Sequence, residues 1–96
     1  MSKTAFITGA TSGIGKATAI ELAKENMNLI LCGRRKQRLD ELKNELSSNV
    51  KVYTLSFDIR NRDEVKQAIA SLPEEFKQID ILINNAGNAH GLDPIQ

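Results

Sequence analysis

A glycine-rich turn, Thr8–Gly15, is the stretch whose residue types and spacing could do chemistry. The short apolar run Ala5–Ile7 precedes it, and a helix-like run follows from Lys16 to Lys24. Glycine permits backbone conformations and close ligand approaches that a Cβ atom would block. The first N–H groups of a helix have no partner inside the helix, and they lie at its positive end. A strand, a glycine turn and a helix in this order therefore predict a binding site for a pyrophosphate.

The candidate ligand contacts of this turn are the residues that could face such an anion. They are Gly9, Thr11, Ser12, Gly13, Ile14 and Gly15. Glycines at this spacing also occur in plain chain reversals, so the turn alone is a weak signal. The binding interpretation is favoured because other polar segments fall where a dinucleotide site would need them.

Strand and helix patterns alternate around the turn. Apolar runs predict strands at 3–8, 29–32, 50–57 and 79–83, and apolar residues three and four apart predict helices at 16–24, 36–46 and from 61 to 72. This alternation is typical of a parallel sheet. We predict an α/β fold, the N-terminal part of a Rossmann doubly wound parallel sheet with strand order 3-2-1-4 and helices on both faces. All of 1–96 belongs to one dinucleotide-binding portion.

Local signals refine the third helix and the packing around it. Asn61 is the expected N-cap, with Glu64 reaching back to the start of the helix. The expected inner face consists of Val65, Ala68, Ile69 and Leu72, and Pro73 ends the regular helix. Phe76 is expected to close over the core from the following turn.

The predicted strand order brings four loops to one edge of the sheet. The winding reverses between strands one and four, and ligands bind outside the carboxyl ends of strands at such a point. The glycine turn and the segment Asn84–Gly87 would flank one crevice there. Gly33–Arg35 and Asp58 follow strands two and three on the same edge. Residues far apart in the sequence are therefore expected to converge.

The end of strand two is expected to select the cofactor. An acidic residue about 20 positions after the glycine turn would bind the ribose 2′-hydroxyl of NAD. This chain instead has Gly33, followed by Arg34 and Arg35. Glycine leaves room for a 2′-phosphate, and a guanidinium binds it with planar, charge-assisted hydrogen bonds. The sequence predicts NADP(H), although both arginines could instead be solvated loop charges.

The other residues at this edge have two interpretations each. The carboxylate of Asp58 could accept from the adenine amino group, or it could be a turn or cap residue beside Asn61. The Asn85 side chain could pin the loop while the backbone of Ala86 and Gly87 approaches the ribose, or the asparagines could only fix the sheet. His90, the only histidine, is interpreted as a loop residue.

Composition excludes several classes of protein. The net charge is +1, which gives no electrostatic reason to expect binding to nucleic acid or to an anionic membrane. The apolar runs are too short to span a bilayer, and no signal peptide is apparent. Cys32 is the only cysteine, so an internal disulfide and a cysteine metal site are excluded, and we expect it to be a buried strand residue. A cytoplasmic location is the expectation.

The chain resembles the short-chain dehydrogenase/reductase family over essentially its whole length. The resemblance rests on Thr8–Gly15 and Asn84–Gly87, with Arg34-Arg35 and Asp58-Ile59 between them. The two arginines and the tail after Gly87 resemble the NADP-dependent 3-hydroxy acid (serine-type) dehydrogenases. The resemblance implies reversible hydride transfer between NADP(H) and a carbonyl or secondary alcohol, with Ile59 beside Asp58 among the cofactor contacts.

The resemblance also implies that part of the enzyme is missing from this sequence. The catalytic serine and the Tyr-x-x-x-Lys motif of the family lie beyond Gln96. Tyr53, the only tyrosine, has no lysine at the fourth place and is expected to be a packing residue. We therefore expect these residues alone to be inactive, with a small-molecule substrate only if the missing half is present. The alternative is a non-catalytic nucleotide-binding or interaction module. The open strand Ile81–Ile83 favours a homo-oligomer or edge-strand association.

Overall fold

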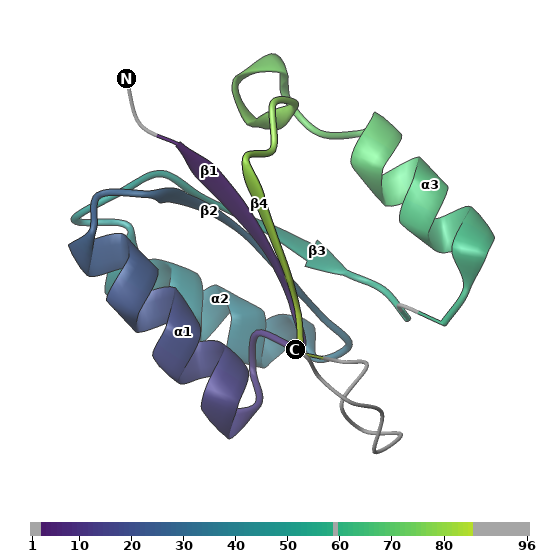
Figure 1. Ribbon diagram of the computed structural model, residues 1–96. Coiled ribbons are helices and arrows are strands. Elements are labelled where there is room, and N and C mark those ends of the chain that lie inside the picture. Colours follow the sequence, from purple (N-terminus) through teal and green to yellow (C-terminus); the bar gives the residue numbers. More distant parts are fainter. Residues whose placement is uncertain (1–2, 59, 86–96) are drawn as a thin grey trace.

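The structure, a computed structural model, describes residues 3–58 and 60–85. Eight elements follow one another along this part of the chain (Figure 1). They are β1 (Thr4–Thr8), α1 (Gly13–Lys24), β2 (Asn28–Gly33), α2 (Lys36–Leu46), β3 (Val52–Ser56), α3 (Arg62–Ala70), the 3₁₀ turn η1 (Glu74–Phe76) and β4 (Ile81–Asn84). The predicted alternation of strands and helices is confirmed.

The four strands form one parallel sheet in the order β3-β2-β1-β4, which is the predicted order. The register places Phe6 of β1 between Ile30 of β2 and Leu82 of β4. On the other side of β2, Gly33 pairs with Ser56 of β3. Because all the strands run in the same direction, the loops that follow them lie along one edge of the sheet. This edge is called the carboxyl edge below.

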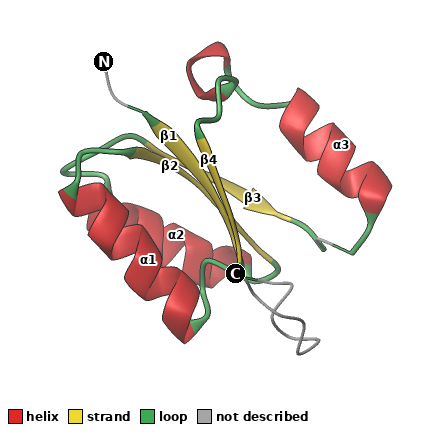
Figure 2. Cartoon of the chain, viewed as in Figure 1, coloured by secondary structure: helices red, strands yellow, loops and turns green. Residues whose placement is uncertain are grey.

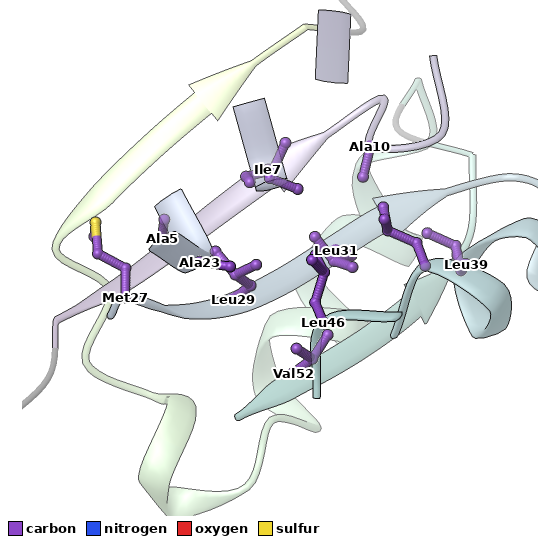
Figure 3. Close-up of a cluster of buried hydrophobic side chains, with 12 residues drawn as sticks. Ala5, Ile7, Ala10, Ala23, Met27, Leu29, Leu31, Leu39, Leu46 and Val52 are labelled. Atoms are coloured by element: carbon purple, nitrogen blue, oxygen red, sulfur yellow. The ribbon is translucent and has the colours of Figure 1, made fainter. Parts of the chain in front are cut away.

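Helices α1 and α2 cover one face of the sheet, and α3 with η1 lies on the other (Figure 2). The larger core fills the space under α1 and α2 (Figure 3). Ala19 and Ala23 are the buried contact residues of α1, and their small size suits a helix that packs closely on a sheet. In α2 the predicted inner residues Leu39, Leu42 and Leu46 are all buried. Helices on both faces are thus confirmed.

A smaller core on the opposite face is built mainly from aromatic and aliphatic residues of β1, β2 and η1. Phe76 is buried, as predicted, and its ring centroid lies 5.5 Å from that of Tyr53. Tyr53 is therefore the packing residue that its position indicated. Cys32 is also buried, and desolvation raises the pKa of its thiol to about 12. A thiol with this pKa stays protonated and unreactive at neutral pH.

Helix α3 differs from the prediction in two respects. Its expected inner face is only partly covered: Leu72 is buried, but Ile69 is 43% exposed and no residue of the helix itself is fully buried. Asn61 caps the helix by accepting from the N–H groups of Asp63 and Glu64. The reciprocal contact expected from Glu64 is wrong, because the Asn61 N–H donates to the carbonyl oxygen of Asp58 instead.

Several element boundaries also differ from the prediction. Helix α1 begins at Gly13 rather than at Lys16, because Ser12 caps it by accepting from the Gly15 N–H. Strand β4 begins at Ile81 rather than at position 79. Just before it, the Asp80 carboxylate accepts from the N–H of Thr4 at 2.8 Å, so a side chain occupies the place of a strand carbonyl. Strand β3 is likewise shorter than the predicted 50–57.

Strand β4 is the least covered strand of the sheet. Leu82 is 67% exposed, and Ile81 is exposed on the other face. Only Ile83 packs against the larger core. Within residues 3–58 and 60–85, no helix has the length and apolar character that crossing a membrane would need.

Burial predicts that a leucine-to-alanine substitution lowers the free energy of unfolding much more in β2 than in β4. In the 96-residue chain, Leu31→Ala is expected to lower the free energy of unfolding by about 2–5 kcal/mol, because Leu31 is fully buried in β2. Leu82→Ala removes the same atoms from an exposed position and is the matched control, with an expected change within about 0.5 kcal/mol. Urea denaturation measures both. Equal losses would contradict the assignment of the core.

Candidate functional site

The turn between β1 and α1 is fixed by glycine at two positions. Gly9 has a φ of 62°, in the region that favours glycine. A Cβ atom on Gly15 would collide with the carbonyl oxygen of Gly9, which no side chain could tolerate. Ser12 completes the turn, because its hydroxyl donates to Gly9 O at 2.8 Å and accepts from Gly15 N at 3.2 Å. The first turn of α1 is therefore held directly against the end of β1.

Gly13 differs from these glycines, because nothing in the fold requires it. A Cβ atom at Gly13 would meet no atom within 4 Å. Within the described part of the chain, the N–H groups of Gly13 and Ile14 have no hydrogen-bond acceptor. The Ile14 side chain is exposed beside them. The start of α1 thus combines open space with unpaired donors.

No side chain in the first turn of α1 neutralises the partial positive charge at the start of the helix. The first turn of α1 contains no acidic residue. Helix α3 shows the contrast, because Asp63 and Glu64 lie in its first turn and Asn61 caps it. The N-terminal end of a helix carries roughly half a positive charge. The end of α1 can therefore bind an external anion, whereas that of α3 is already neutralised by its own side chains.

The loops after β2 and β3 meet at the carboxyl edge. The backbone N–H of Phe57 donates to Gly33 O at 3.0 Å, and the Ser56 hydroxyl donates to Arg34 O at 3.5 Å. Arg34 Nη1 lies 3.9 Å from Asp58 Oδ2. Thr11 of the glycine turn is close as well, since its hydroxyl oxygen lies 3.6 Å from the point that a Cβ atom of Gly33 would occupy. The predicted convergence of these three loops is confirmed.

Arg60 binds the Asp58 carboxylate more closely than Arg34 does. Asp58 Oδ1 accepts from the Arg60 backbone N–H at 3.0 Å and from Nε at 3.1 Å, and Oδ2 accepts from Nη2 at 3.0 Å. These hydrogen bonds with Arg60, side chain first, lower the pKa of Asp58 to about 2. Arg60 was not among the residues that the sequence singled out. Its spacing of two residues from Asp58 in a non-helical segment gave only a weak signal.

The last residues of β1 and β4 are joined through their side chains. The Thr8 hydroxyl donates to Asn84 Oδ1 at 2.9 Å and lies 3.4 Å from Ile83 O. Asn84 therefore ties β4 to β1, which agrees with the alternative that the asparagines fix the sheet. The Asn85 Nδ2 atom is buried and has no acceptor within the described residues. Ile59, Ala86, Gly87 and His90 lie outside the residues that the structure describes.

Arg35 lies at the same edge but makes no comparable contact. It is the N-cap residue of α2, its side chain makes no capping hydrogen bond, and it is exposed. A hollow of about 950 Å³ lies at the opposite edge of the sheet, around the first residues of β2 and β3. It is separate from the convergent loops. The hollow is open, and its lining includes Lys51 and Glu75, which form an ordinary surface ion pair.

The two glycines of α1 predict opposite effects on stability. Gly15→Ala is expected to destabilise the chain by about 1–3 kcal/mol, because backbone atoms must move away from the new Cβ. Gly13→Ala is the matched control and should be neutral or stabilising by up to about 1 kcal/mol, since alanine favours a helix. Chemical denaturation compares the two. A large loss of stability in Gly13→Ala would disprove the open space assigned to Gly13.

The Asp58 ion pair predicts an unusual titration. The carboxyl should titrate near pH 2 by NMR, and Arg60→Gln should bring its pKa back toward 3.8. Because the folded pKa is lowered, the stability from this ion pair is fully present above pH 3.8 and is lost as the pH falls through 2. Arg34→Gln should raise the pKa less, since its guanidinium is farther away. Equal shifts in the two variants would contradict the geometry.

Comparisons with known proteins agree with this arrangement. The sequence profile of the short chain dehydrogenase family matches residues 3–96. The serine 3-dehydrogenase of Rhizobium radiobacter is 49% identical over 98% of the chain, and the sulfoacetaldehyde reductase 2 of Chromohalobacter salexigens is 47% identical over 100% of it. The crystal structure of L-sorbose reductase from Gluconobacter frateurii, complexed with NADPH and L-sorbose, superposes with a TM-score of 0.83 at 38% identity.

The coverage of these relatives is unequal. The match to L-sorbose reductase covers 90% of this chain and 34% of that one. The chain spans 37% and 38% of the lengths of the two curated relatives. The matched residues include the glycine turn, the arginines after β2 and the asparagines after β4. The chain belongs to the short chain dehydrogenase family.

Proposed function

We propose that this chain is the cofactor-binding part of an oxidoreductase that transfers a hydride between NADP(H) and a carbonyl or secondary alcohol. The observation that carries the proposal is an open, uncompensated helix start on the same edge of the sheet as an exposed arginine. The N–H groups of Gly13 and Ile14 suit a pyrophosphate. Arg34, whose side chain is 67% exposed, suits the 2′-phosphate that distinguishes NADP from NAD.

The residues of the carboxyl edge fit this cofactor. Gly13 leaves room beside the helix start, whereas a Cβ atom on Gly33 would already contact Leu39 and the Thr11 hydroxyl. The buried Nδ2 donor of Asn85 needs an acceptor, which a ribose hydroxyl could provide. Asp58 and Ile59 are the proposed adenine contacts, and Ala86 and Gly87 complete the proposed ribose contacts. Gly9, Thr11, Ser12 and Gly15 shape the turn.

The reaction needs groups beyond those of this chain. NADP(H) supplies or accepts the hydride when bound. A proton must also move, and the only tyrosine of the chain packs against Phe76 instead of facing the site. These residues therefore bind and orient the cofactor, and the general acid and the substrate pocket belong elsewhere. The similarity to a serine 3-dehydrogenase favours a 3-hydroxy acid as substrate.

The proposal extends to association and location. The exposed Leu82 and Ile81 lie on a strand with one free edge, which favours pairing with a further strand or with a second copy of the chain. The second copy would make a homo-oligomer. A cytoplasmic location is consistent with the single cysteine, which is free and buried.

Cofactor preference is the direct test of the proposed function. NADPH should bind more tightly than NADH to the protein as its gene encodes it, with any residues that follow codon 96. Arg34→Asp should weaken the binding of NADPH by about 10- to 100-fold, because it removes a charge-assisted hydrogen bond. NADH should then bind more tightly than NADPH. Lys51→Asp makes the same charge change at the opposite edge and should leave the order intact. Fluorescence titration measures the affinities, and equal binding of NADPH and NADH would reject the Arg34 assignment.

The second candidate is a nucleotide-binding module without turnover. It is favoured by one observation, the packing of Tyr53 against the smaller core, which leaves these residues without a catalytic tyrosine. Sequencing the gene past codon 96 distinguishes the two. A continuing frame with a serine and a Tyr-x-x-x-Lys motif supports the enzyme, whereas a stop codon supports the module.

A further inference from the structure

Two arginines converge on one carboxylate at the carboxyl edge. Arg60 Nε and Nη2 each bind a different oxygen of Asp58, at 3.1 and 3.0 Å. Arg34 Nη1 lies 3.9 Å from Oδ2, which is beyond hydrogen-bond distance. Both arginine side chains are about two thirds exposed, at 67% and 66%. The same carboxylate is thus held firmly by one guanidinium and only approached by the other.

This arrangement is a competition for Asp58. An arginine and a carboxylate form their strongest pair when two parallel N–H groups meet two oxygens. Arg60 satisfies both oxygens, and its backbone N–H adds a third hydrogen bond. If Arg60 were absent, both oxygens would be open to Arg34. The exposed Arg34 side chain could rotate to form the two-bond pair itself, since its backbone is already held beside β3.

A second competition would then arise at Arg34. Under the proposed function, Arg34 binds the 2′-phosphate of the cofactor. An arginine engaged by two oxygens of Asp58 would have to break that pair before it bound phosphate. Asp58 would also place a negative charge beside the incoming phosphate, whereas the Arg60–Asp58 pair has no net charge. Occupation of Asp58 by Arg60 therefore favours a phosphorylated ligand in both respects.

We propose that Arg60 is a positioning residue for cofactor selection: by occupying the Asp58 carboxylate, it keeps Arg34 available for the 2′-phosphate of NADP(H). This inference rests on the proposed function and adds a residue that acts without touching the cofactor. The low pKa of Asp58 agrees with it, because the hydrogen bonds from Arg60 are its largest cause and the charge of Arg34 its smallest.

The test is the ratio of the affinities for NADPH and NADH, which differ only in the 2′-phosphate. Fluorescence titrations would compare the unchanged protein, as its gene encodes it, with Arg60→Gln, Asp58→Asn and the double variant. Arg60→Gln is expected to lower the ratio by about 2- to 5-fold, the scale of an exposed ion pair. In the Asp58→Asn background the same change should have no effect, because the competing carboxylate is gone. Arg60→Lys should fall between, since lysine cannot form two parallel bonds.

Arg62→Gln is the matched control. It removes one positive charge two residues further along, and within the described residues Arg62 forms no ion pair. Its ratio should be unchanged. Thermal unfolding of each variant identifies a folding defect. Such a defect would weaken the binding of NADPH and NADH equally and leave the ratio of their affinities unchanged.

Two outcomes would overturn the inference. One is an unchanged or raised ratio in Arg60→Gln. The other is an equal fall in the presence and absence of the Asp58 carboxylate, which would mean that Arg60 binds the phosphate directly. Neither touches the proposed function, which fails only if the unchanged protein binds neither cofactor or does not prefer NADPH.

Discussion

The first turn of α1 lies against the carbonyl group of Gly9 so closely that only glycine fits at position 15. This contact fixes where the helix begins and therefore where its unpaired N–H groups lie. The positive φ of Gly9 turns the chain toward the helix, and Ser12 closes the turn from both sides. The position of the proposed pyrophosphate site thus depends on backbone packing, and side chains only reinforce it.

The parallel sheet extends this local arrangement across the whole edge. Because every strand ends at the same side, β2 and β3 deliver Arg34 and Asp58 beside the glycine turn, and β4 delivers its asparagines on the other flank. Hydrogen bonds join neighbouring strand ends, as between Phe57 and Gly33 and between Thr8 and Asn84. The loops are therefore held at their bases by the sheet.

Electrostatics divide the carboxyl edge into neutralised and open positions. Helix α3 satisfies its own N-terminal end with Asn61 and two acidic residues, and Arg60 neutralises Asp58. The start of α1 and the guanidinium of Arg34 are left for an external anion. These two open positions suit the pyrophosphate bridge and the 2′-phosphate of the proposed NADP(H) ligand.

The sequence by itself determined the order of the elements, the parallel sheet and the candidate loops. Apolar periodicity and the glycine spacing are local properties, and a parallel sheet brings strand ends together whatever the side chains are. Only the tertiary structure decided which side chains pair at that edge. Arg60 rather than Arg34 holds Asp58, Asn84 rather than Asn85 reaches Thr8, and Ile69 stays partly exposed. Such choices depend on differences of about an ångström between neighbouring strands and loops, and no pattern in one chain encodes those distances.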